Sequence, residues 1–381
     1  MDHPKPTRRD VLRGLGAATL LAACGEEPTL TATAPDTVPA ATGDTGVFDA
    51  GAADTAVGGE ADANSSADAG AMAPDAADVA APPDPPEPPD ASIAPITPNA
   101  DHFVTSIGDA PAIDVATWAI ALLDRGSPVG QLGLPLLESL GAEAVEHTLE
   151  CISANPGRQA ISNAIWTGVT LKTALTAAGV AVPAGVVQLK FTGADGYTTA
   201  LPLSDLDAPA WLVWRMNGEP LPPDHGFPAR LLVPGRYGMK SPKWIVQLEF
   251  IDQPWLGTWE DDGWSDAAPY LCHTFIRTPA VGAAVSAGLV HVSGTAFAGS
   301  DPVVSVEVSV DEGPWQKATL DYAPGPNIWT LWSLDVTLAA GHHKAKARCT
   351  TAAGVMSQAD AFGSQYPAGY QGSMELELDV A

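Results

Sequence analysis

Residues 25–98 have the composition of a tether rather than of a folded domain. The segment is built mainly from Ala, Asp, Thr, Gly and Pro, contains no Lys or Arg, and carries 14 acidic residues. Such a chain cannot bury enough apolar surface to offset the entropy that ordering would cost. We therefore predict a disordered acidic linker over residues 25–98, so that folding is confined to the residues that follow.

The residues before the linker have the pattern of an export signal. Arg8 and Arg9 form a twin-arginine pair, an apolar run covers residues 15–23, and Cys24 ends a lipobox-like Leu-Ala-Ala-Cys sequence. The apolar run is shorter than the roughly 20 residues that a membrane-spanning helix needs. The pattern predicts a twin-arginine lipoprotein signal over residues 1–24. We expect a lipid on Cys24 to anchor the chain to a membrane, at the periplasmic face or the cell surface.

Much of the negative charge of the chain lies in the linker rather than in the part expected to fold. The chain has a formal net charge of −27, and the 14 acidic residues of the linker account for about half of it. A strongly acidic protein is a poor candidate for binding the phosphate backbone of nucleic acids. The charge therefore bears on solubility and spacing rather than on the substrate, and we expect no nucleic-acid partner.

The remaining chain is long enough for two domains, and its pattern changes near Pro279. Residues 99–278 mix short strands, expected at 189–191 and 212–214, with a helix expected from 169 to 178. In residues 279–381 the segment 304–310 alternates apolar and polar residues with the period of a half-buried strand. Further strands are expected at 289–297, 329–338 and 343–350. The prediction is an α+β chain, with a mixed α/β domain followed by an antiparallel β-sandwich.

Three segments carry a more specific pattern. They are Thr-Leu-Glu-Cys-Ile-Ser at 148–153, Asn-Ala-Ile-Trp-Thr-Gly-Val at 163–169, and the basic and aromatic stretch at 225–244. Together they resemble the sulfite oxidase family of molybdopterin enzymes. The resemblance covers the chain from Asp101 onward. It implies a molybdopterin-binding domain over 99–278 and an immunoglobulin-like domain of the dimerisation type over 279–381.

The resemblance also implies a role for each matching residue. Cys151 would be the metal ligand and a catalytic residue, its thiolate binding the molybdenum of a molybdenum-molybdopterin cofactor. From composition alone, a buried structural cysteine is the ordinary alternative. The residues implied in cofactor binding are His225, Arg230, Ser241, Lys243, Asp101 and Thr105.

The chain departs from the family where sulfite would bind. The resemblance places the substrate-site arginines of sulfite-oxidising members at Thr105, Pro156 and Asn327, and their tyrosine at Trp264. We assign Trp264 to the catalytic site. A sulfite dianion would lose charge-assisted hydrogen bonds here, although Arg158 could replace some of them. We therefore expect sulfite itself not to be the substrate.

These observations favour a molybdopterin-dependent oxidoreductase that transfers an oxygen atom at a sulfur or similar small-molecule centre. The choice between oxidation and sulfoxide reduction stays open. The sequence has no haem or flavin motif, so we expect a separate electron-transfer partner, either a haem protein or a quinone-linked one. A homodimer is also left open.

Two further alternatives remain. The altered arginine positions allow a cofactor-free binding module, displayed as a surface lipoprotein, that keeps the fold without the chemistry. Cys272 and Cys349 have no role in the matching segments, and a disulfide between them is allowed outside the cytoplasm. The sequence does not decide whether the two residues are close together.

Overall fold

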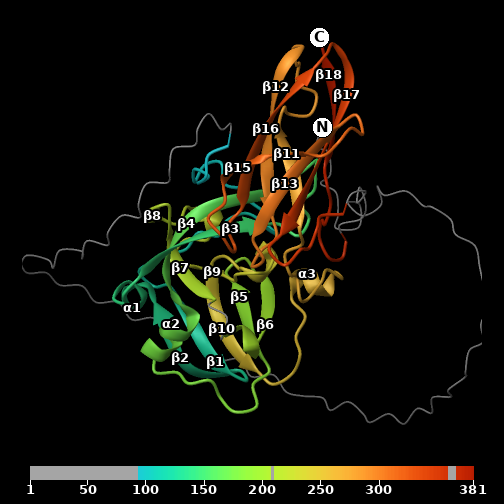
Figure 1. The fold of residues 1–381 in the computed structure, drawn as a ribbon. Helices are drawn as coiled ribbons and strands as arrows, with labels where there is room; N and C mark the ends of the chain where they lie inside the picture. Colours follow the sequence, from blue (N-terminus) through green and yellow to red (C-terminus); the bar gives the residue numbers. More distant parts are fainter. Residues whose placement is uncertain (1–92, 207–209, 359–365) are drawn as a thin grey trace, which may run out of the picture. The chain divides into compact units, whose positions relative to one another are not determined.

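The computed structural model describes residues 93–206, 210–358 and 366–381, all of which fall within one compact unit (Figure 1). The export signal over 1–24 and the linker up to residue 92 lie outside the described residues. The described part is mostly β-sheet, with three short α-helices, α1 (Leu134–Glu138), α2 (Leu171–Ala177) and α3 (Thr258–Asp261). Within these ranges no helix is both long and apolar enough to cross a bilayer.

The first domain contains a five-stranded sheet in the order β2-β1-β10-β5-β6. Its strands are β1 (Ala119–Asp124), β2 (Ser127–Gly133), β5 (Gln188–Gly193), β6 (Thr198–Pro202) and β10 (Ile245–Ile251). Strands β1 and β10 run parallel, while the other neighbours pair antiparallel. The strand expected at 189–191 is confirmed as part of β5.

A second sheet of the same domain has the order β3-β4-β7-β8, with β9 also paired to β7. Its strands are β3 (Glu143–Glu150), β4 (Ile161–Thr170), β7 (Trp211–Met216), β8 (Glu219–Pro220) and β9 (Arg230–Leu232). Gly168 lets β4 approach β7, since a Cβ atom there would lie 2.2 Å from the carbonyl oxygen of Leu212. The glycine of the 163–169 segment therefore has a packing role.

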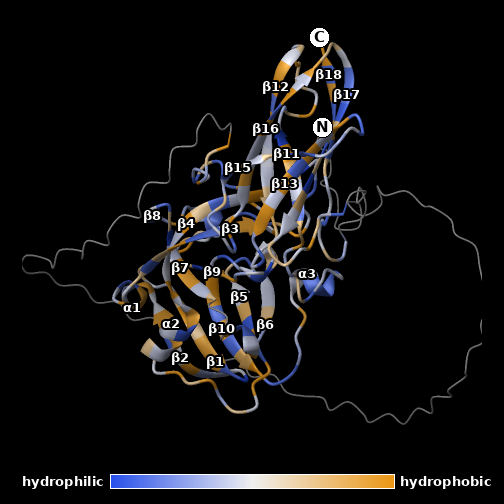
Figure 2. Cartoon of the chain, in the orientation of Figure 1, coloured by the Kyte–Doolittle hydropathy of each residue, from blue (hydrophilic) through white to orange (hydrophobic). Residues whose placement is uncertain are grey.

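Helix α2 packs with residues from both sheets in one hydrophobic cluster. Thr170 caps the helix, because its side chain accepts a hydrogen bond from the backbone N–H of Thr173. Leu171 and Leu175 on the helix cluster with Phe191 of β5 and residues of β7 and β10. Figure 2 shows β7, β9 and β10 with hydrophobic colour along much of their length. Burial of these faces holds the two sheets together.

The C-terminal part consists of two antiparallel four-stranded sheets, ordered β11-β12-β16-β15 and β14-β13-β17-β18. Their strands are β11 (His273–Thr278), β12 (Gly288–Phe297), β13 (Val303–Val310), β14 (Gln316–Lys317), β15 (Thr319–Tyr322), β16 (Thr330–Leu338), β17 (Gly341–Thr351) and β18 (Glu375–Val380). In β13, Val306 and Val308 are buried and Glu307 between them is less buried, as the period-two pattern predicts. Val304 belongs to the same face but is exposed, next to the shift of strand register between Val303 and Ser305. The four strands expected in this region are confirmed.

One hydrophobic cluster contains residues of both the N-terminal sheets and the C-terminal sheets. Ile152, Ala160 and Tyr237 of the first domain belong to the same cluster as Phe275 and Trp332 of the C-terminal sheets. Backbone hydrogen bonds add to this contact, because the N–H of Thr148 donates to the carbonyl of Asn327 at 2.9 Å. The β3 strand that leads to Cys151 is thus held from the C-terminal side.

Cys272 and Cys349 are brought together by the C-terminal sheets. Both are buried free thiols, and their Sγ atoms lie 3.5 Å apart. Cys349 lies in β17 and Cys272 just before β11, so the pair joins the two sheets.

The expected α+β class is met only in part, because strands dominate both domains. The helix expected from 169 to 178 forms only over Leu171–Ala177, since Val169 and Thr170 continue strand β4. Both residues are β-branched and favour strands.

Candidate active site

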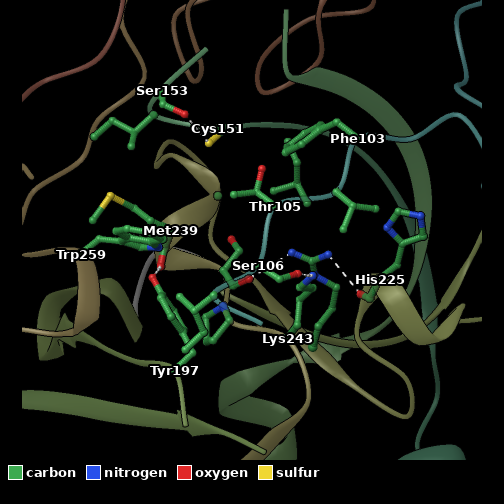
Figure 3. Close-up of a pocket in the computed structure, with 18 of the residues that line it drawn as sticks. Phe103, Thr105, Ser106, Cys151, Ser153, Tyr197, His225, Met239, Lys243 and Trp259 are labelled. Carbon is green, nitrogen blue, oxygen red and sulfur yellow. Dashed lines mark hydrogen bonds between the residues drawn. The ribbon is translucent and has the colours of Figure 1, made fainter. Parts of the chain in front are cut away.

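One cavity in the first domain brings most of the predicted site residues together (Figure 3). Seven of the eight predicted residues line it: Thr105, Cys151, His225, Arg230, Ser241, Lys243 and Trp264. Asp101 does not line it. Its side chain is exposed, and it borders a separate depression together with Arg277 and Trp329. His102, the next residue along the chain, is buried and lines the main cavity instead.

Cys151 lies at the end of β3, where the chain turns toward β4. Its backbone N–H donates to the carbonyl of Ala160 at 3.0 Å, and its carbonyl accepts from the N–H of Ala154 at 2.8 Å. The thiol is half-buried, and its Sγ atom lies 3.1 Å from the hydroxyl oxygen of Ser153. These backbone bonds fix the position of the sulfur in the cavity wall without covering it.

The turn between β3 and β4 is built by Asn155. Its side-chain oxygen accepts hydrogen bonds from the backbone N–H groups of Gly157 and Arg158, at 2.8 and 3.0 Å. Such side-chain bonds to the backbone are typical of asparagine in tight turns. Pro156 lies in this turn and does not line the cavity, whereas the Arg158 side chain does. The turn therefore directs an arginine back toward Cys151.

Arg230 is a buried cation near the opposite end of the cavity. Its guanidinium donates to the carbonyl oxygens of His225 at 3.1 Å and Ser241 at 3.0 Å, and its Nε has no partner. Burial lowers the pKa of Arg230 to about 10, and the side chain also lies over the ring of Trp166 at 5.3 Å. No carboxylate is among these partners, so the site holds an uncompensated positive charge that favours an anion.

Two other basic side chains line the same cavity. Lys243 donates to the Ser106 hydroxyl at 2.7 Å and to the Asp224 carbonyl at 2.8 Å. Burial, followed by the nearby charge of Arg230, lowers the pKa of Lys243 to about 7. Burial also lowers the pKa of His225, whose Nε2 lies 2.9 Å from the carbonyl oxygen of Asn99. An arriving anion would relieve this mutual repulsion.

The cavity therefore has two chemically different ends. Figure 3 shows His225 and Lys243 away from Cys151 and Ser153, with Thr105 and Ser106 between them. The apolar and aromatic part of the lining includes Phe103, Tyr197, Met239, Trp259 and Trp264. The first end suits a phosphate, while the second suits an organic group.

Several lining residues were not singled out from the sequence. Tyr197 donates from its hydroxyl to the carbonyl of Met239 at 2.6 Å, and burial raises its pKa well above the usual value. Ser106 accepts from Lys243, yet it follows Thr105 directly. The sequence offered only weak signals for these two residues: Ser106 follows the matched residue Thr105, and Tyr197 is aromatic. Neither signal is specific to a cofactor site.

A buried ion pair supports the aromatic wall. Lys240, directly after Met239, pairs with the carboxylate of Glu260, directly after Trp259. Both side chains are almost fully buried, and Glu260 also accepts from the hydroxyl of Thr199 at 2.8 Å. The pair ties the backbone of two lining residues together from behind.

A second buried contact lies behind Cys151. The Oε1 atom of Glu150 is 3.1 Å from the Nε2 atom of His273 on β11. Burial raises the pKa of Glu150 well above its usual value and lowers that of His273 to about 4. A neutral carboxylic acid therefore faces a neutral imidazole between the two domains.

The donor set fits a cofactor that carries a phosphate and needs one thiolate ligand. Arg230 presents an unpartnered buried Nε, and Lys243 stands beside it with its charge partly desolvated. Gly226 allows the chain to turn closely here, because its φ is +112° and a Cβ would lie 3.0 Å from the Cβ of Arg230. Among the described residues, no three His, Cys, Asp or Glu side chains gather into a metal site of their own.

The cavity thus combines a cluster of basic side chains with a half-buried cysteine. Residues 107–259 match the family model described as the oxidoreductase molybdopterin binding domain. The chain is also similar to the mitochondrial sulfite oxidase of Homo sapiens, 29% identical over 303 residues that cover 67% of this chain and 55% of that protein. Over the matched residues, the chain is therefore similar to molybdopterin-binding oxidoreductases that include the sulfite oxidases.

Other relatives extend the comparison. The NAD(P)H nitrate reductase of Hordeum vulgare is 27% identical over 309 residues, covering 63% of this chain and 34% of that protein. The sulfane dehydrogenase SoxCD of Paracoccus pantotrophus has a similar structure, with a TM-score of 0.66 and 21% identity over 74% of this chain and 81% of that one. That likeness shows the fold. The chain spans about half the length of the sulfite oxidases that it matches.

Proposed function

We propose that this chain is a molybdopterin-dependent oxidoreductase that transfers an oxygen atom at a sulfur or similar small-molecule centre. The observation that carries the proposal is the placement of Cys151, Arg230 and Lys243 in a single cavity. A thiol alone has the ordinary alternative of a structural cysteine. A thiol that shares a cavity with a buried, carboxylate-free arginine matches what a phosphate-bearing metal cofactor requires.

Each residue of the cavity has a task in this proposal. Arg230 and Lys243 would bind the phosphate of the pterin, and His225 would contact the pterin beside them. Ser241 orients this end, because its hydroxyl accepts from the backbone N–H of Val233 at 3.0 Å and its carbonyl binds Arg230. When bound, the molybdenum cofactor supplies two-electron redox chemistry coupled to oxygen transfer.

Cys151 would hold the metal, and the residues around it would orient the substrate. Ser153 lies close enough to hydrogen bond to the sulfur and so to tune its electron density. Trp264 would form one wall of the substrate site, a role that its position in the cavity supports. Thr105 and Asn327 offer no cation, and Asn327 does not line the cavity. Sulfite is therefore not the substrate that we propose.

The setting of the enzyme is also part of the proposal. The sequence of residues 1–24 supports export by the twin-arginine route and a lipid anchor at Cys24. The enzyme would then exchange electrons with a haem protein or a quinone-linked protein at the periplasmic face or cell surface. The two antiparallel sheets of the C-terminal part support an immunoglobulin-like domain, through which a homodimer could form.

The test is the cofactor content of the protein. The full chain is produced in a host that makes molybdopterin, purified after export, and analysed for molybdenum and for released pterin. We expect equal amounts of both, matching the amount of protein. The Arg230→Met variant should lose both, while Cys151→Ser should keep pterin and lose the visible absorption of the thiolate–metal bond. Arg215, a partly exposed arginine on β7 that does not line the cavity, provides the control variant Arg215→Met.

The competing function is a cofactor-free binding module of the same fold. It predicts that wild-type protein from this host contains neither molybdenum nor pterin. That result, obtained with a host whose own molybdopterin enzymes are active, would contradict the proposed oxidoreductase.

A further inference from the structure

We propose that the substrate site takes an organosulfur monoanion, with Arg158 binding its sulfur-oxygen head and the aromatic wall binding its organic group. Aryl or alkyl sulfinates are the class meant, and the corresponding sulfonates are the products. The inference rests on the proposed function, because it concerns the substrate end of the same cavity. It goes beyond that function because it names the substrate class: Arg158 would bind the anionic head of the substrate, and the aromatic wall would bind its organic group.

Arg158 is the cation at the thiol end. Its Nη1 donates to the Ser153 hydroxyl at 3.2 Å, and its Nη2 donates to the Thr105 hydroxyl at 2.9 Å. The same Ser153 oxygen lies 3.1 Å from the Cys151 sulfur. The guanidinium is thus linked to the thiol through one hydroxyl group, which sets it beside the place where a reacting sulfur atom would be held.

The guanidinium is held but not neutralised by these contacts. Both partners are neutral hydroxyl groups, and a guanidinium has five N–H donors in a planar fork. Donors therefore remain for an oxyanion that enters the cavity. A planar fork also suits the two oxygens of a sulfinate head, which it can bind side by side.

The charges of the cavity set the charge of the ligand. Among the described lining residues, the lysines and arginines are Arg158, Arg230 and Lys243. Arg230 and Lys243 hold the end that fits the cofactor phosphate, bound to the carbonyls of His225, Ser241 and Asp224. Two carboxylates, Asp195 and Asp224, also line the cavity, and their charges act on Lys243. Arg158, which is exposed to solvent, is the cation linked to the thiol through Ser153. Its single charge matches a monoanion, whereas an inorganic dianion would lose more hydration than one guanidinium replaces.

The remaining wall suits an organic substituent. Trp264 is half-buried in the wall, and its ring packs edge-to-face against the ring of Tyr366, with centroids 5.2 Å apart. Trp259 and Met239 line the same cavity and are tied by the buried Lys240–Glu260 pair behind them. Aromatic and thioether surfaces offer little to a small hydrated dianion. They gain from covering a ring or an alkyl chain.

The reaction balances with the partner already proposed. Oxidation of a sulfinate to a sulfonate forms one new sulfur–oxygen bond with oxygen from water, releases two protons and delivers two electrons. The electrons go to the haem or quinone-linked protein. No carbon–sulfur bond breaks, so the organic group can stay on the aromatic wall throughout.

The test measures binding on the holoenzyme with unreactive probes. Benzenesulfonate serves as the monoanion, sulfate as the dianion and methyl phenyl sulfone as the neutral analogue, each titrated by calorimetry and by tryptophan fluorescence. We expect benzenesulfonate to bind about tenfold or more tightly than the neutral sulfone, since one charge-assisted hydrogen bond contributes at least that factor. It should also bind more tightly than sulfate, because sulfate has no organic group to cover the aromatic wall.

The variants separate the two parts of the site. Arg158→Gln should weaken benzenesulfonate binding about tenfold and leave the sulfone unchanged, because only the anion uses the guanidinium. Trp264→Ala should weaken both organic probes and leave sulfate unchanged. Arg215→Gln on the surface of β7 should change none of them.

Two outcomes would overturn the inference. Sulfate binding as tightly as benzenesulfonate would show that the organic surface contributes nothing. An equal loss for all three probes in Arg158→Gln would show that the arginine acts only on the fold. Because the same preparation is analysed for molybdenum and pterin, failure here with a loaded enzyme leaves the proposed function standing, whereas absence of cofactor counts against that function.

Discussion

The ammonium group of Lys240 and the carboxylate of Glu260 form an ion pair that is shielded from solvent, with 1% and 0% of their side-chain surfaces exposed. Lys240 donates further to the carbonyl of Ala200 at 3.1 Å and to Asp266 at 2.8 Å. Removing both charges from water costs free energy that these hydrogen bonds offset only in part, because the Oε2 atom of Glu260 has no hydrogen-bond partner among the described residues. The pair therefore depends on its neighbours, and it supports the wall of the cavity in return.

Breaking this pair should cost much of the stability of the protein. We expect Lys240→Met to lower the free energy of unfolding by about 3–5 kcal/mol, because Glu260 would keep an unpaired buried charge. The double variant Lys240→Met with Glu260→Leu should recover most of the loss. Urea unfolding followed by tryptophan fluorescence measures all three proteins. A single variant as stable as wild type would show that the pair does not stabilise the fold.

Buried histidines should make the protein sensitive to acid. Burial lowers the pKa of His102 to about 3 and those of His147 and His273 to about 4. Each ring is neutral in the folded protein and takes up a proton on unfolding below about pH 6.5, which weakens the fold by about 1.4 kcal/mol per pH unit per group. Stability from these rings is present above about pH 6.5 and is lost as the pH falls toward about 4.

Glu150 acts in the opposite direction over the upper part of this range. Its raised pKa means that the folded protein keeps a proton that the unfolded chain releases. We therefore expect a net uptake of about two protons on unfolding near pH 5.5. Urea unfolding of the cofactor-free protein at a series of pH values measures this slope. A flat or inverted profile would contradict the assignment of neutral buried rings.

Gly168 should be irreplaceable. In Gly168→Ala the new methyl group would lie 2.2 Å from the Leu212 carbonyl oxygen and 2.7 Å from the Val213 Cα. Backbone cannot yield locally inside a paired strand, so we expect a loss of about 3 kcal/mol or more, or no soluble protein. Gly108→Ala is the matched control, because nothing lies within 4 Å of the added carbon. Similar stability of both variants would be inconsistent with the close β4–β7 approach.

The cysteines should differ in their reaction with an alkylating reagent. Cys151 is half-buried at a cavity wall, whereas Cys272 and Cys349 are 4% and 1% exposed. In native cofactor-free protein we expect iodoacetamide to modify Cys151, and the other two only after denaturation in the presence of a reductant. Cofactor-loaded protein should protect Cys151 as well. Peptide mapping by mass spectrometry reads each site, and modification of loaded Cys151 at the cofactor-free rate would argue against its role as a ligand.

Local motifs predicted much of the site, but they could not predict which neighbouring side chain faces inward. Residues 148–153 and 225–244 carried a pattern specific enough to place Cys151, His225 and Arg230 in one cavity. Near residue 101 the match was weak. There the N–H groups of Asp101 and His102 both donate to the carbonyl of Pro98. This turn leaves Asp101 outside and buries His102, a choice that depends on tertiary packing.

Other parts of the site depend on long-range contacts that no local pattern reveals. Tyr197 reaches the cavity because β6 follows β5 in the sheet, and its hydroxyl binds a carbonyl 42 residues away. Arg158 reaches Thr105 across 53 residues because the Asn155 turn reverses the chain. The strands were easier to predict, since the period-two burial of segments such as 304–310 is a local property.

One hydrophobic cluster joins the two parts of the described chain, and this limits where the protein can be truncated. Its members include Ile152, Ala160, Tyr237, Phe275 and Trp332. A fragment that ended at residue 259, where the family match stops, would expose Ile152 and Ala160, on either side of the turn between β3 and β4, to water. Such a truncated product should precipitate or be degraded by proteases rather than serve as a minimal catalyst. For the same reason, destabilising substitutions deep in β11 or β16 should disturb the cavity around Cys151 from a distance, without changing any residue that lines it.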